Sequence, residues 1–368
     1  QCRLSLVAPV RAKGFDHTTQ GAFAAAAGVA RALGLDAERT AHAIAISGTA
    51  NAALRVTRTG QLSHWKGLAY PYTGCSATTA AFLAMQGITG PLEVFEGNKG
   101  FMEAIAGPFT HDWAREDLEL VRRTSLKRYN AEFHSQSALE GLLELRAAHG
   151  LDAASAEQVT RIAVTIFDVV YHIIGGGEEG NKQEVRTKEQ ADHSLPYLLA
   201  VALLDGEVGP AQYRPERIAR ADVQALLRRV EVRPDAAMSA RFPEAMPCQV
   251  EIHLRDGQVL RSEKADFEGF FTRPMPWERV AAKFGRLAAP FAEAALRGEI
   301  VEAVANLEAI PVAELIARLA RVRAPASAAA RPGDPGGQGE RIPSAALASE
   351  ERTEEHGRPQ RPQRPQRP

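Results

Sequence analysis

The sequence predicts a mostly α-helical fold in which a second domain of α+β structure interrupts the helices. Alanine-rich segments with helical spacing fill residues 1–112, and helical patterns return over residues 274–322. Residues 113–273 instead contain segments that alternate apolar and polar positions, together with an Asp256-Gly257 pair typical of a β-hairpin. We therefore expect an all-helical domain built from both chain ends and an inserted mixed α+β domain with antiparallel strands.

The first region divides into short helices separated by stop signals. Gly21–Leu33 carries small and apolar residues at helical spacing, which predicts a helix that packs closely against its neighbours. Gly34 stands where a left-handed helix end belongs, and Asp36 can cap the helix that follows. Further helices are expected at Thr73–Met85 and Asn98–Ile105, so this region forms the N-terminal part of the helical domain.

Strand signals are confined to the second region. Val159–Phe167 alternates apolar and polar residues, as a half-buried strand does, and Thr124–Tyr129 also has strand character. Cys248–Leu254 and Val259–Phe267 flank the Asp256-Gly257 turn, which is the strongest short hairpin signal in the chain. These segments predict a sheet with antiparallel pairing.

The other segments of residues 113–368 are predicted to be helical or disordered. Helices are expected at Phe133–His149 and Thr187–Leu204, with Pro196 kinking the second or marking its start. The helices that begin at Trp277 cannot bury an apolar face alone, so we expect them to dock on the first domain. Residues 323–368, which end in RPQRPQRPQRP, predict a disordered tail, and a proline-rich docking ligand is the alternative.

The composition is that of an ordinary globular protein, with 45% hydrophobic and 24% charged residues. A net charge of −1 provides no general field for nucleic acid or an anionic membrane, and no apolar run reaches membrane-spanning length. Cys2, Cys75 and Cys248 are too few and too far apart for a disulfide framework, a zinc site or an iron–sulfur cluster. No glycine-rich nucleotide motif leads from a strand into a helix. We therefore expect a cytoplasmic protein without a metal or cofactor.

The stretch Leu54–Cys75, LRVTRTGQLSHWKGLAYPYTGC, has the residue types of an anion-binding site. It interleaves Arg55, Arg58, His64 and Lys66 with tryptophan and tyrosine, in a loop ahead of an alanine-rich helix. Guanidinium, imidazole and ammonium groups each bind carboxylate oxygens, so the stretch suits a small molecule with several carboxylates. A solvated basic loop explains the same composition, and composition alone leaves both interpretations open.

Five blocks of the sequence, taken in order, resemble the MmgE/PrpD family. The blocks are GFDHTTQGAFAAAAGVARALGL, ALRVTRTGQLSHWKGLAYPYTGC, AMQGITGPLEVFEGNKGF, KRYNAEFHSQSALEGLLEL and ADHSLPYLLAVALLDG. This is the family of 2-methylcitrate dehydratase, with cis-aconitate decarboxylase as a relative, and the second and fifth blocks look more like the dehydratase branch. The resemblance, which extends from about residue 14 to residue 319, implies a helical domain, an inserted α+β domain and a homodimer.

The resemblance also implies an active site. His17 and Lys66 match a histidine and the active-site lysine of the family. His134 and Gln136 lie in the block that supplies polar groups from the second domain, although the decarboxylase relative places a histidine nearer Gln136. Tyr171 and His193 are further neighbours. Family members carry an additional N-terminal helical segment with an acidic residue and a histidine of the site, for which this chain shows no counterpart, so we expect the chain by itself to be impaired.

The reaction implied by this resemblance is dehydration of 2-methylcitrate or a similar 2-hydroxy tricarboxylate, as in the propionate-degrading 2-methylcitrate cycle. Removing a proton beside a carboxylate and expelling hydroxide requires a base, an acid and cations for the developing charge. Histidine supplies an acid or base near neutral pH, and lysine supplies a compact cation. The predicted catalytic residues are His17, Lys66 and His134. The predicted substrate-binding residues are Arg55, Arg58, His64, Gln136, Tyr171 and His193.

Other interpretations of these residues stay open at this point. His17 could cap the helix that follows it, His134 could be a satisfied interface histidine, and His193 could bind the backbone near Pro196. Two other functions are also open, namely decarboxylation of a cis-aconitate-like substrate and a non-catalytic role in binding anions or a partner. For the enzyme functions the expected partner is a small tricarboxylate, and neither nucleic acid nor a membrane is expected.

Overall fold

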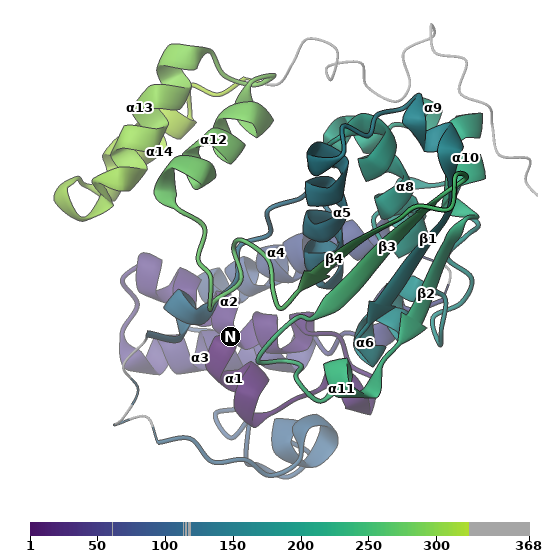
Figure 1. Cartoon of the computed structure of the whole chain (residues 1–368). Coiled ribbons are helices and arrows are strands. Elements are labelled where there is room, and N and C mark those ends of the chain that lie inside the picture. The colour runs from purple at the N-terminus through teal and green to yellow at the C-terminus, as the bar shows by residue number, and fades with distance from the viewer. Residues whose placement is uncertain (61, 113, 115, 117–118, 324–368) are drawn as a thin grey trace, which may run out of the picture. The chain divides into compact units, whose positions relative to one another are not determined.

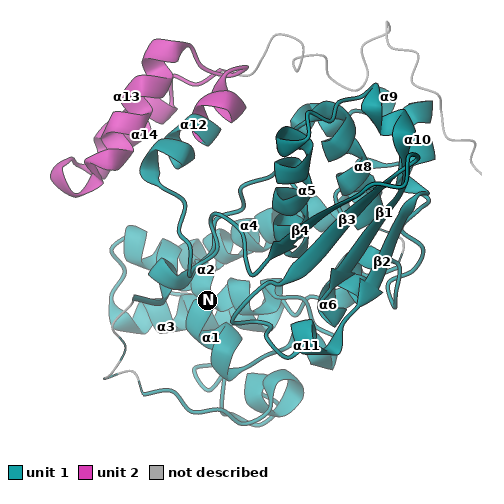
Figure 2. Ribbon diagram, in the orientation of Figure 1, with its two compact units in different colours: residues 1–283 teal, residues 284–368 magenta. Residues whose placement is uncertain are grey.

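The computed structural model describes residues 1–60, 62–112, 114, 116 and 119–323 (Figure 1). The chain divides into two compact units, residues 1–283 and residues 284–368 (Figure 2). The tail predicted to be disordered lies outside the described residues, except for Arg323. No helix among the described residues is long and apolar enough to cross a membrane.

The first unit begins with four α-helices, which are α1 (Cys2–Val7), α2 (Thr18–Ala32), α3 (Ala37–Ala50) and α4 (Trp65–Met85). Helices α2, α3 and α4 pack against one another through faces made mainly of alanine. Gly48 of α3 approaches the ring of Phe23 so closely that a Cβ atom would lie 2.0 Å from it. As predicted, Gly34 is left-handed (φ 70°) and the Asp36 carboxylate caps α3 by accepting from the Arg39 amide at 2.8 Å.

The sequence predicted that the basic stretch is a loop as far as Thr73, but half of the stretch is helical. A 3₁₀ turn spans Arg55–Arg58, and α4 begins at Trp65 rather than at Thr73. Pro71 lies inside α4, where sequence rules predict a break, but burial of the alanine face of the helix offsets the missing hydrogen bond. Lys66 therefore lies in the first turn of a helix, with only 9% of its surface exposed.

Two other predicted elements differ in the structure. The helix expected at Asn98–Ile105 is a single π-helical turn over Met102–Ala106. Thr124–Tyr129 is not a strand. The amide of Leu126 donates to the carbonyl of Gly269 at 2.7 Å, so this segment binds to a loop instead of joining the sheet. Strand propensity alone did not reveal that partner.

The second region contains a mixed sheet of β1 (Val159–Ile166), β2 (Val230–Pro234), β3 (Cys248–Leu254) and β4 (Val259–Lys264), in the order β2-β1-β3-β4. Strands β3 and β4 pair antiparallel around Asp256-Gly257, as predicted, and β1 is antiparallel to β3. Strand β2 pairs parallel with β1, with Ile162 opposite Val230. The sequence did not predict this pairing because parallel neighbours require a long crossover that local patterns do not specify.

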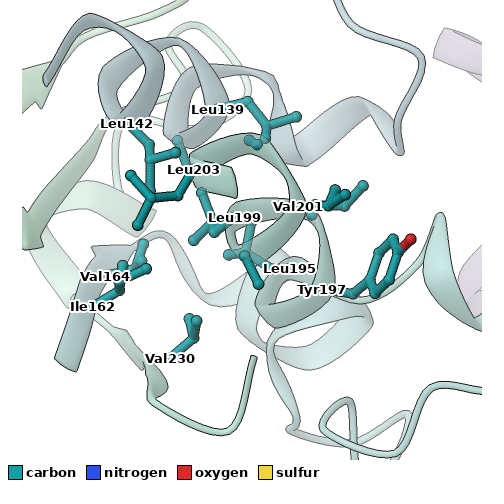
Figure 3. Packing of buried hydrophobic residues seen from close by; sticks show 14 of the residues in the cluster. Leu139, Leu142, Ile162, Val164, Leu195, Tyr197, Leu199, Val201, Leu203 and Val230 are labelled. Carbon is teal, nitrogen blue, oxygen red and sulfur yellow. The ribbon is translucent and has the colours of Figure 1, made fainter. Parts of the chain in front are cut away.

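One face of the sheet is covered by α5 (Gln136–Ala148) and α8 (Leu195–Asp205). Every residue of Leu195–Leu204 is buried, which is the pattern of a helix enclosed on all sides. Figure 3 shows α8 packed among Leu139 and Leu142 of α5 and Ile162 of β1. Pro196 lies in the first turn of α8, so it marks the start of that helix rather than a kink.

The segment predicted as one helix over Thr187–Leu204 is two helices, α7 (Lys188–Ala191) and α8. Thr187 caps α7 through a capping box, and the Ser194 hydroxyl caps α8 by accepting from the Tyr197 amide at 3.1 Å. The break between the helices places Asp192 and His193 in a tight turn. Both side chains are thereby held by two capped helices.

The remaining α-helices are α6 (Asp168–Val170), α9 (Pro215–Ile218), α10 (Ala221–Leu227), α11 (Ala236–Ser239), α12 (Trp277–Ala288), α13 (Ala294–Ala305) and α14 (Val312–Leu319). The second unit has its own small core, in which Leu296 and Ile300 of α13 pack with Leu315 of α14. The helices expected after Trp277 are therefore present. Their docking on the first helices stays a prediction.

Candidate functional site

Three histidines of the first unit each face a carboxylate through the same ring atom. The pairs are His17 Nδ1 with Asp16 Oδ1 at 3.2 Å, His134 Nδ1 with Glu132 Oε1 at 2.7 Å, and His193 Nδ1 with Asp192 Oδ1 at 2.6 Å. No described residue forms a hydrogen bond with Nε2 of any of the three. A carboxylate at Nδ1 favours the tautomer with its hydrogen there, which leaves the Nε2 lone pair available as a base.

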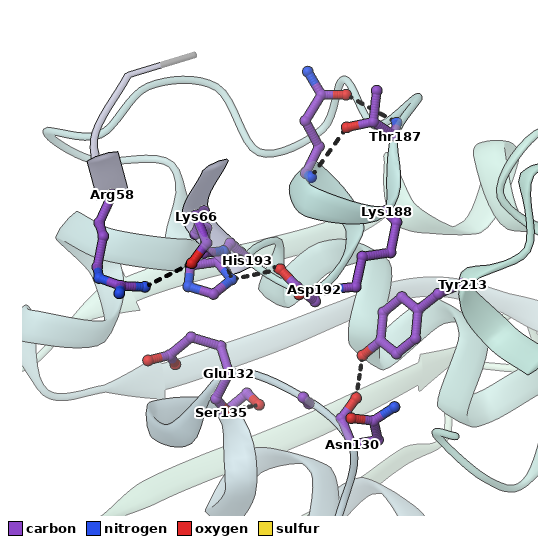
Figure 4. Close-up of polar contacts among 12 residues, drawn as sticks. Arg58, Lys66, Asn130, Glu132, Ser135, Thr187, Lys188, Asp192, His193 and Tyr213 are labelled. Atoms are coloured by element: carbon purple, nitrogen blue, oxygen red, sulfur yellow. Dashed lines mark hydrogen bonds and ion pairs between the residues drawn. The ribbon is translucent and has the colours of Figure 1, made fainter. Parts of the chain in front are cut away.

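Lys66 joins the third of these pairs from the first turn of α4. Its Nζ atom donates to Asp192 Oδ1 at 3.1 Å and also contacts Nδ1 of His193. Lys188 Nζ donates to the other oxygen of Asp192 at 2.6 Å. Figure 4 shows Lys66 and His193 on one side of Asp192 and Lys188 on the other. One carboxylate thus links α4 to the turn between α7 and α8.

The two charges of this link have altered pKa values. Burial lowers the pKa of Lys66 to about 8, although Asp192 acts to raise it. Burial would raise the pKa of Asp192, but hydrogen bonds and charge from His193, followed by the charge of Lys66, lower it. At neutral pH Asp192 is therefore a carboxylate, and Lys66 is an ammonium group close to its own titration range.

Glu132 connects the second pair to the third. Burial would raise the pKa of Glu132, but the charge and hydrogen bonds of His134, together with the charge of His193, bring it to about 2. The negative charge of Glu132 also acts on Lys66. Figure 4 shows Glu132 near Lys66 and His193, so the two histidine pairs and the lysine share one electrostatic environment.

Arg58 connects the first pair to Lys66. Its Nε atom donates to Asp16 Oδ2 at 2.5 Å, and its Nη1 atom donates to the Lys66 carbonyl at 3.4 Å. The other oxygen of the buried Asp16 accepts from the Thr18 amide at 3.0 Å. Arg58 therefore holds Asp16 and the first turn of α4 together, and its charge is already matched by a carboxylate.

His17 precedes α2 but makes no side-chain capping hydrogen bond, so the capping interpretation is not supported. Its ring stacks on Tyr70 with the ring centroids 6.0 Å apart. Burial lowers the pKa of His17, while the neighbouring Asp16 acts to raise it. The imidazole of His17 is accordingly biased toward its neutral, basic form.

Two further arginines provide positive charge near these pairs. Arg55 Nη2 donates to Glu179 Oε1 at 3.3 Å. Arg11 lies within the electrostatic range of Asp16, Glu132 and Glu179, and burial followed by the charge of Arg55 lowers its pKa. The Arg11 guanidinium forms no hydrogen bond with any residue that the structure describes. Arg11 is therefore available to bind a carboxylate of a ligand.

The arrangement combines three potential acid/base groups, a lysine and arginines in a single cluster, which suits proton transfer on an anionic molecule. Within the described part of the chain, no group of three or more His, Cys, Asp or Glu residues could hold a metal ion. Residues 1–114 match the MmgE/PrpD N-terminal domain, and residues 129–309 match the MmgE/PrpD C-terminal domain. The chain belongs to the MmgE/PrpD family.

Several members of the family are similar to this chain over much of its length. A 2-methylcitrate dehydratase of Cupriavidus necator is 25% identical over 321 residues, which cover 82% of this chain and 64% of that protein. A 2-methylcitrate dehydratase of Salmonella typhimurium is 27% identical, covering 66% of this chain and 51% of its own length. A cis-aconitate decarboxylase of Homo sapiens is 23% identical, covering 78% and 59%. The chain thus spans less than two thirds of the length of these relatives.

Six of the predicted site residues meet in this cluster, which contains His17, Arg55, Arg58, Lys66, His134 and His193. The other three have different surroundings. His64 is 91% exposed at its side chain and lies 4.0 Å from Glu189. Gln136 is buried, and its amide binds only backbone groups of Tyr129 and Glu132, so its geometry does not support substrate binding. Tyr171 begins a π-helix and packs on the ring of His172.

Four acidic residues of this site and one arginine were not predicted from the sequence. These residues are Arg11, Asp16, Glu132, Glu179 and Asp192. A local signal was available for three of them, because an acidic residue stands one or two positions before each of the three histidines. Glu179 and Arg11 carry no such signal, since their place in the cluster depends on residues far away in the chain.

Proposed function

We propose that this member of the MmgE/PrpD family is a hydro-lyase that removes water from 2-methylcitrate or a similar 2-hydroxy tricarboxylate. The observation that carries the proposal is the cluster of three histidines, each with a carboxylate at Nδ1, around Lys66, whose pKa is lowered to about 8. The similarity to 2-methylcitrate dehydratases, at about a quarter identity, supports the same reaction class.

The proposed chemistry uses the imidazole groups of the cluster and the ammonium group of Lys66. An imidazole Nε2, from His17 or His134, takes the proton on the carbon beside a substrate carboxylate, and the electron pair of that bond forms the new double bond. The hydroxyl group leaves from the adjacent carbon and takes a proton from a second imidazolium, so that the products are an unsaturated tricarboxylate and water. Lys66 stabilises the negative charge that develops on the carboxylate.

The arginines have different roles in this proposal. Arg11 is the first candidate for binding a distal carboxylate, because its guanidinium forms no hydrogen bond with a described residue. Arg55 and Arg58 are matched by Glu179 and Asp16, so we assign them to holding the acidic residues in place. This assignment changes the expectation that both of these arginines bind substrate directly.

The test is product analysis with 2-methylcitrate and with cis-aconitate by NMR spectroscopy. We expect loss of water from 2-methylcitrate, which leaves three carboxylates in the product. Loss of carbon dioxide from cis-aconitate would instead establish a decarboxylase, which the similarity to cis-aconitate decarboxylases keeps as the second candidate. Saturable binding of both compounds without any product would contradict both lyase proposals.

Variants of the histidines test the site within the same assay. His17→Gln and His134→Gln should each reduce turnover by about 10²–10⁴-fold, the range for loss of a general acid or base. His149→Gln is the matched control, because His149 is exposed at the end of α5 and forms no side-chain hydrogen bond with a described residue. Equal activity of all three variants would place the reaction elsewhere.

A further inference from the structure

Asp192 accepts hydrogen bonds from three nitrogen atoms that belong to three different side chains. Lys66 Nζ and His193 Nδ1 lie 3.1 Å and 2.6 Å from its Oδ1 atom, and Lys188 Nζ lies 2.6 Å from Oδ2. Lys66 comes from α4, whereas the other residues surround the turn between α7 and α8. Among the carboxylates of the described cluster, Asp192 alone binds both a lysine and a histidine, namely Lys66, which was predicted to be catalytic, and His193, which was predicted to bind substrate.

The number of hydrogen atoms on His193 Nδ1 limits how this atom can bind its two partners. His193 Nδ1 contacts both Asp192 Oδ1 and Lys66 Nζ, and a ring nitrogen carries at most one hydrogen. In the neutral ring, Nδ1 either donates its hydrogen to Asp192 or accepts one from Lys66. In the first case the Nε2 lone pair is free for catalysis, and in the second case Nε2 carries the hydrogen.

We propose that Asp192 is a positioning residue that holds His193 in the tautomer with hydrogen on Nδ1 and keeps Lys66 as an ammonium group. A carboxylate accepts hydrogen bonds but cannot donate them, so it favours the arrangement in which both neighbours donate to it. The catalytic consequence, a basic Nε2 beside a charged lysine, rests on the proposed lyase function. The tautomer and the charge of Lys66 do not depend on it.

The other charges around Lys66 agree with this role. Lys188 disfavours the ammonium form of Lys66, whereas Glu132 favours it from the side of the second histidine pair. Burial opposes the charge most strongly, and Asp192 is the largest influence that favours it. Removing the charge of Asp192 would therefore leave burial and Lys188 to convert Lys66 to a neutral amine near pH 7.

The experiment measures both properties directly in the whole chain. Two-bond ¹H–¹⁵N spectra of protein with ¹⁵N-labelled histidine report the tautomer of each ring, and the loss of one set of signals in His193→Gln assigns His193. We expect hydrogen on Nδ1 in the unaltered protein and hydrogen on Nε2 in Asp192→Asn. Asp192→Glu, which keeps the charge, should retain the Nδ1 form.

Lys66 is followed by its rate of acetylation as a function of pH, with peptide mass spectrometry as the readout. We expect Asp192→Asn to lower the pKa of Lys66 by about 1–3 units, the range for losing an opposite charge at this distance. Asp205→Asn is the matched control, because Asp205 also forms a close ion pair, with Arg217 at 2.5 Å, but forms no hydrogen bond or ion pair with Lys66 or His193. This control should leave both readouts unchanged.

Two outcomes would overturn the proposal. One is a neutral His193 ring with its hydrogen on Nε2 in the unaltered protein, a result that requires no variant to fold. The other is an unchanged pKa of Lys66 in Asp192→Asn. A protein that shows the expected tautomer and pKa shift but converts no tricarboxylate would contradict the proposed function while supporting the role of Asp192.

Discussion

Two carboxylates of the first unit, the partly buried Asp192 and the buried Glu140, bind positively charged groups of different kinds. Asp192 binds Lys66, His193 and Lys188, and burial lowers the pKa of Lys66 to about 8. Glu140 of α5 is 1% exposed, and its ion-pair partners among the described residues are all groups that keep their positive charge. Those groups are Arg128, Lys264 and Arg273.

The partners of each carboxylate indicate whether it serves stability or chemistry. The partners of Glu140 come from β4 and from the loops on either side of the α+β region, so the carboxylate ties these segments to α5. No histidine is among its hydrogen-bond partners in the described residues. The partners of Asp192 include the groups that could exchange protons with a ligand. We therefore expect changes at the two carboxylates to have separable effects.

The largest expected effect is on turnover at the Asp192 cluster. Lys66→Met should reduce turnover by about 10²–10³-fold, since it removes one preorganised group that stabilises developing charge. Lys66→Arg should restore only part of this loss, because a planar guanidinium does not fit a site built for an ammonium group. Steady-state kinetics with 2-methylcitrate provide the measurement.

The control for Lys66→Met is Arg220→Met, which alters an exposed arginine paired with Asp222 at the start of α10. Thermal unfolding of both variants should show that the fold is retained. Near-normal turnover of Lys66→Met would show that the Asp192 cluster, like the Glu140 cluster, does not act in catalysis.

The second effect is on stability at the Glu140 cluster. Glu140→Gln should reduce the free energy of unfolding by roughly 3 kcal/mol, because it removes the buried negative charge that binds Lys264 and Arg273. Turnover per folded molecule should be unchanged. Urea denaturation and the lyase assay together test the separation, and a loss of turnover larger than the loss of folded protein would show that the clusters are coupled.

The third prediction concerns the alkaline side of the pH–rate profile. The pKa of Lys66 is about 8, lowered mainly by burial, so the ammonium form is lost as the pH rises through that value. We expect turnover to fall above about pH 8, approaching a tenfold loss per unit. Measurement of turnover between pH 6 and pH 10 checks this, and a flat profile across that range would separate Lys66 from the rate-determining step.

The smallest expected effect is on stability at acid pH, and it concerns the carboxylate of Glu140. Burial would raise the pKa of Glu140, but hydrogen bonds from Lys264, the Glu268 amide and Arg273 bring it to about 2. Because the folded-state pKa is lowered, its stabilising contribution is present above the unfolded value near 4.5 and is lost as the pH falls from there toward 2. The difference in melting temperature between the unaltered protein and Glu140→Gln should therefore shrink between about pH 5 and pH 3.

The sequence by itself determined the elements whose signals are local. Helical spacing with the Gly34 stop identified α2, alternation identified β1, and Asp256-Gly257 identified the β3–β4 hairpin. The family resemblance implied that His17 and Lys66 belong to the active site, and in the structure both lie in one cluster. Such features persist in the fold because they depend on neighbours within a few positions of the chain.

Only the tertiary structure decided which distant groups meet. Local patterns did not indicate that Lys66 is buried and binds Asp192, or that β2 pairs parallel with β1. The family resemblance implied that Gln136 binds substrate, and in the structure its amide forms hydrogen bonds with backbone groups of Tyr129 and Glu132. Contacts of this kind depend on how α4, the sheet and the α7–α8 turn pack together, and burial in that packing also sets the pKa of Lys66.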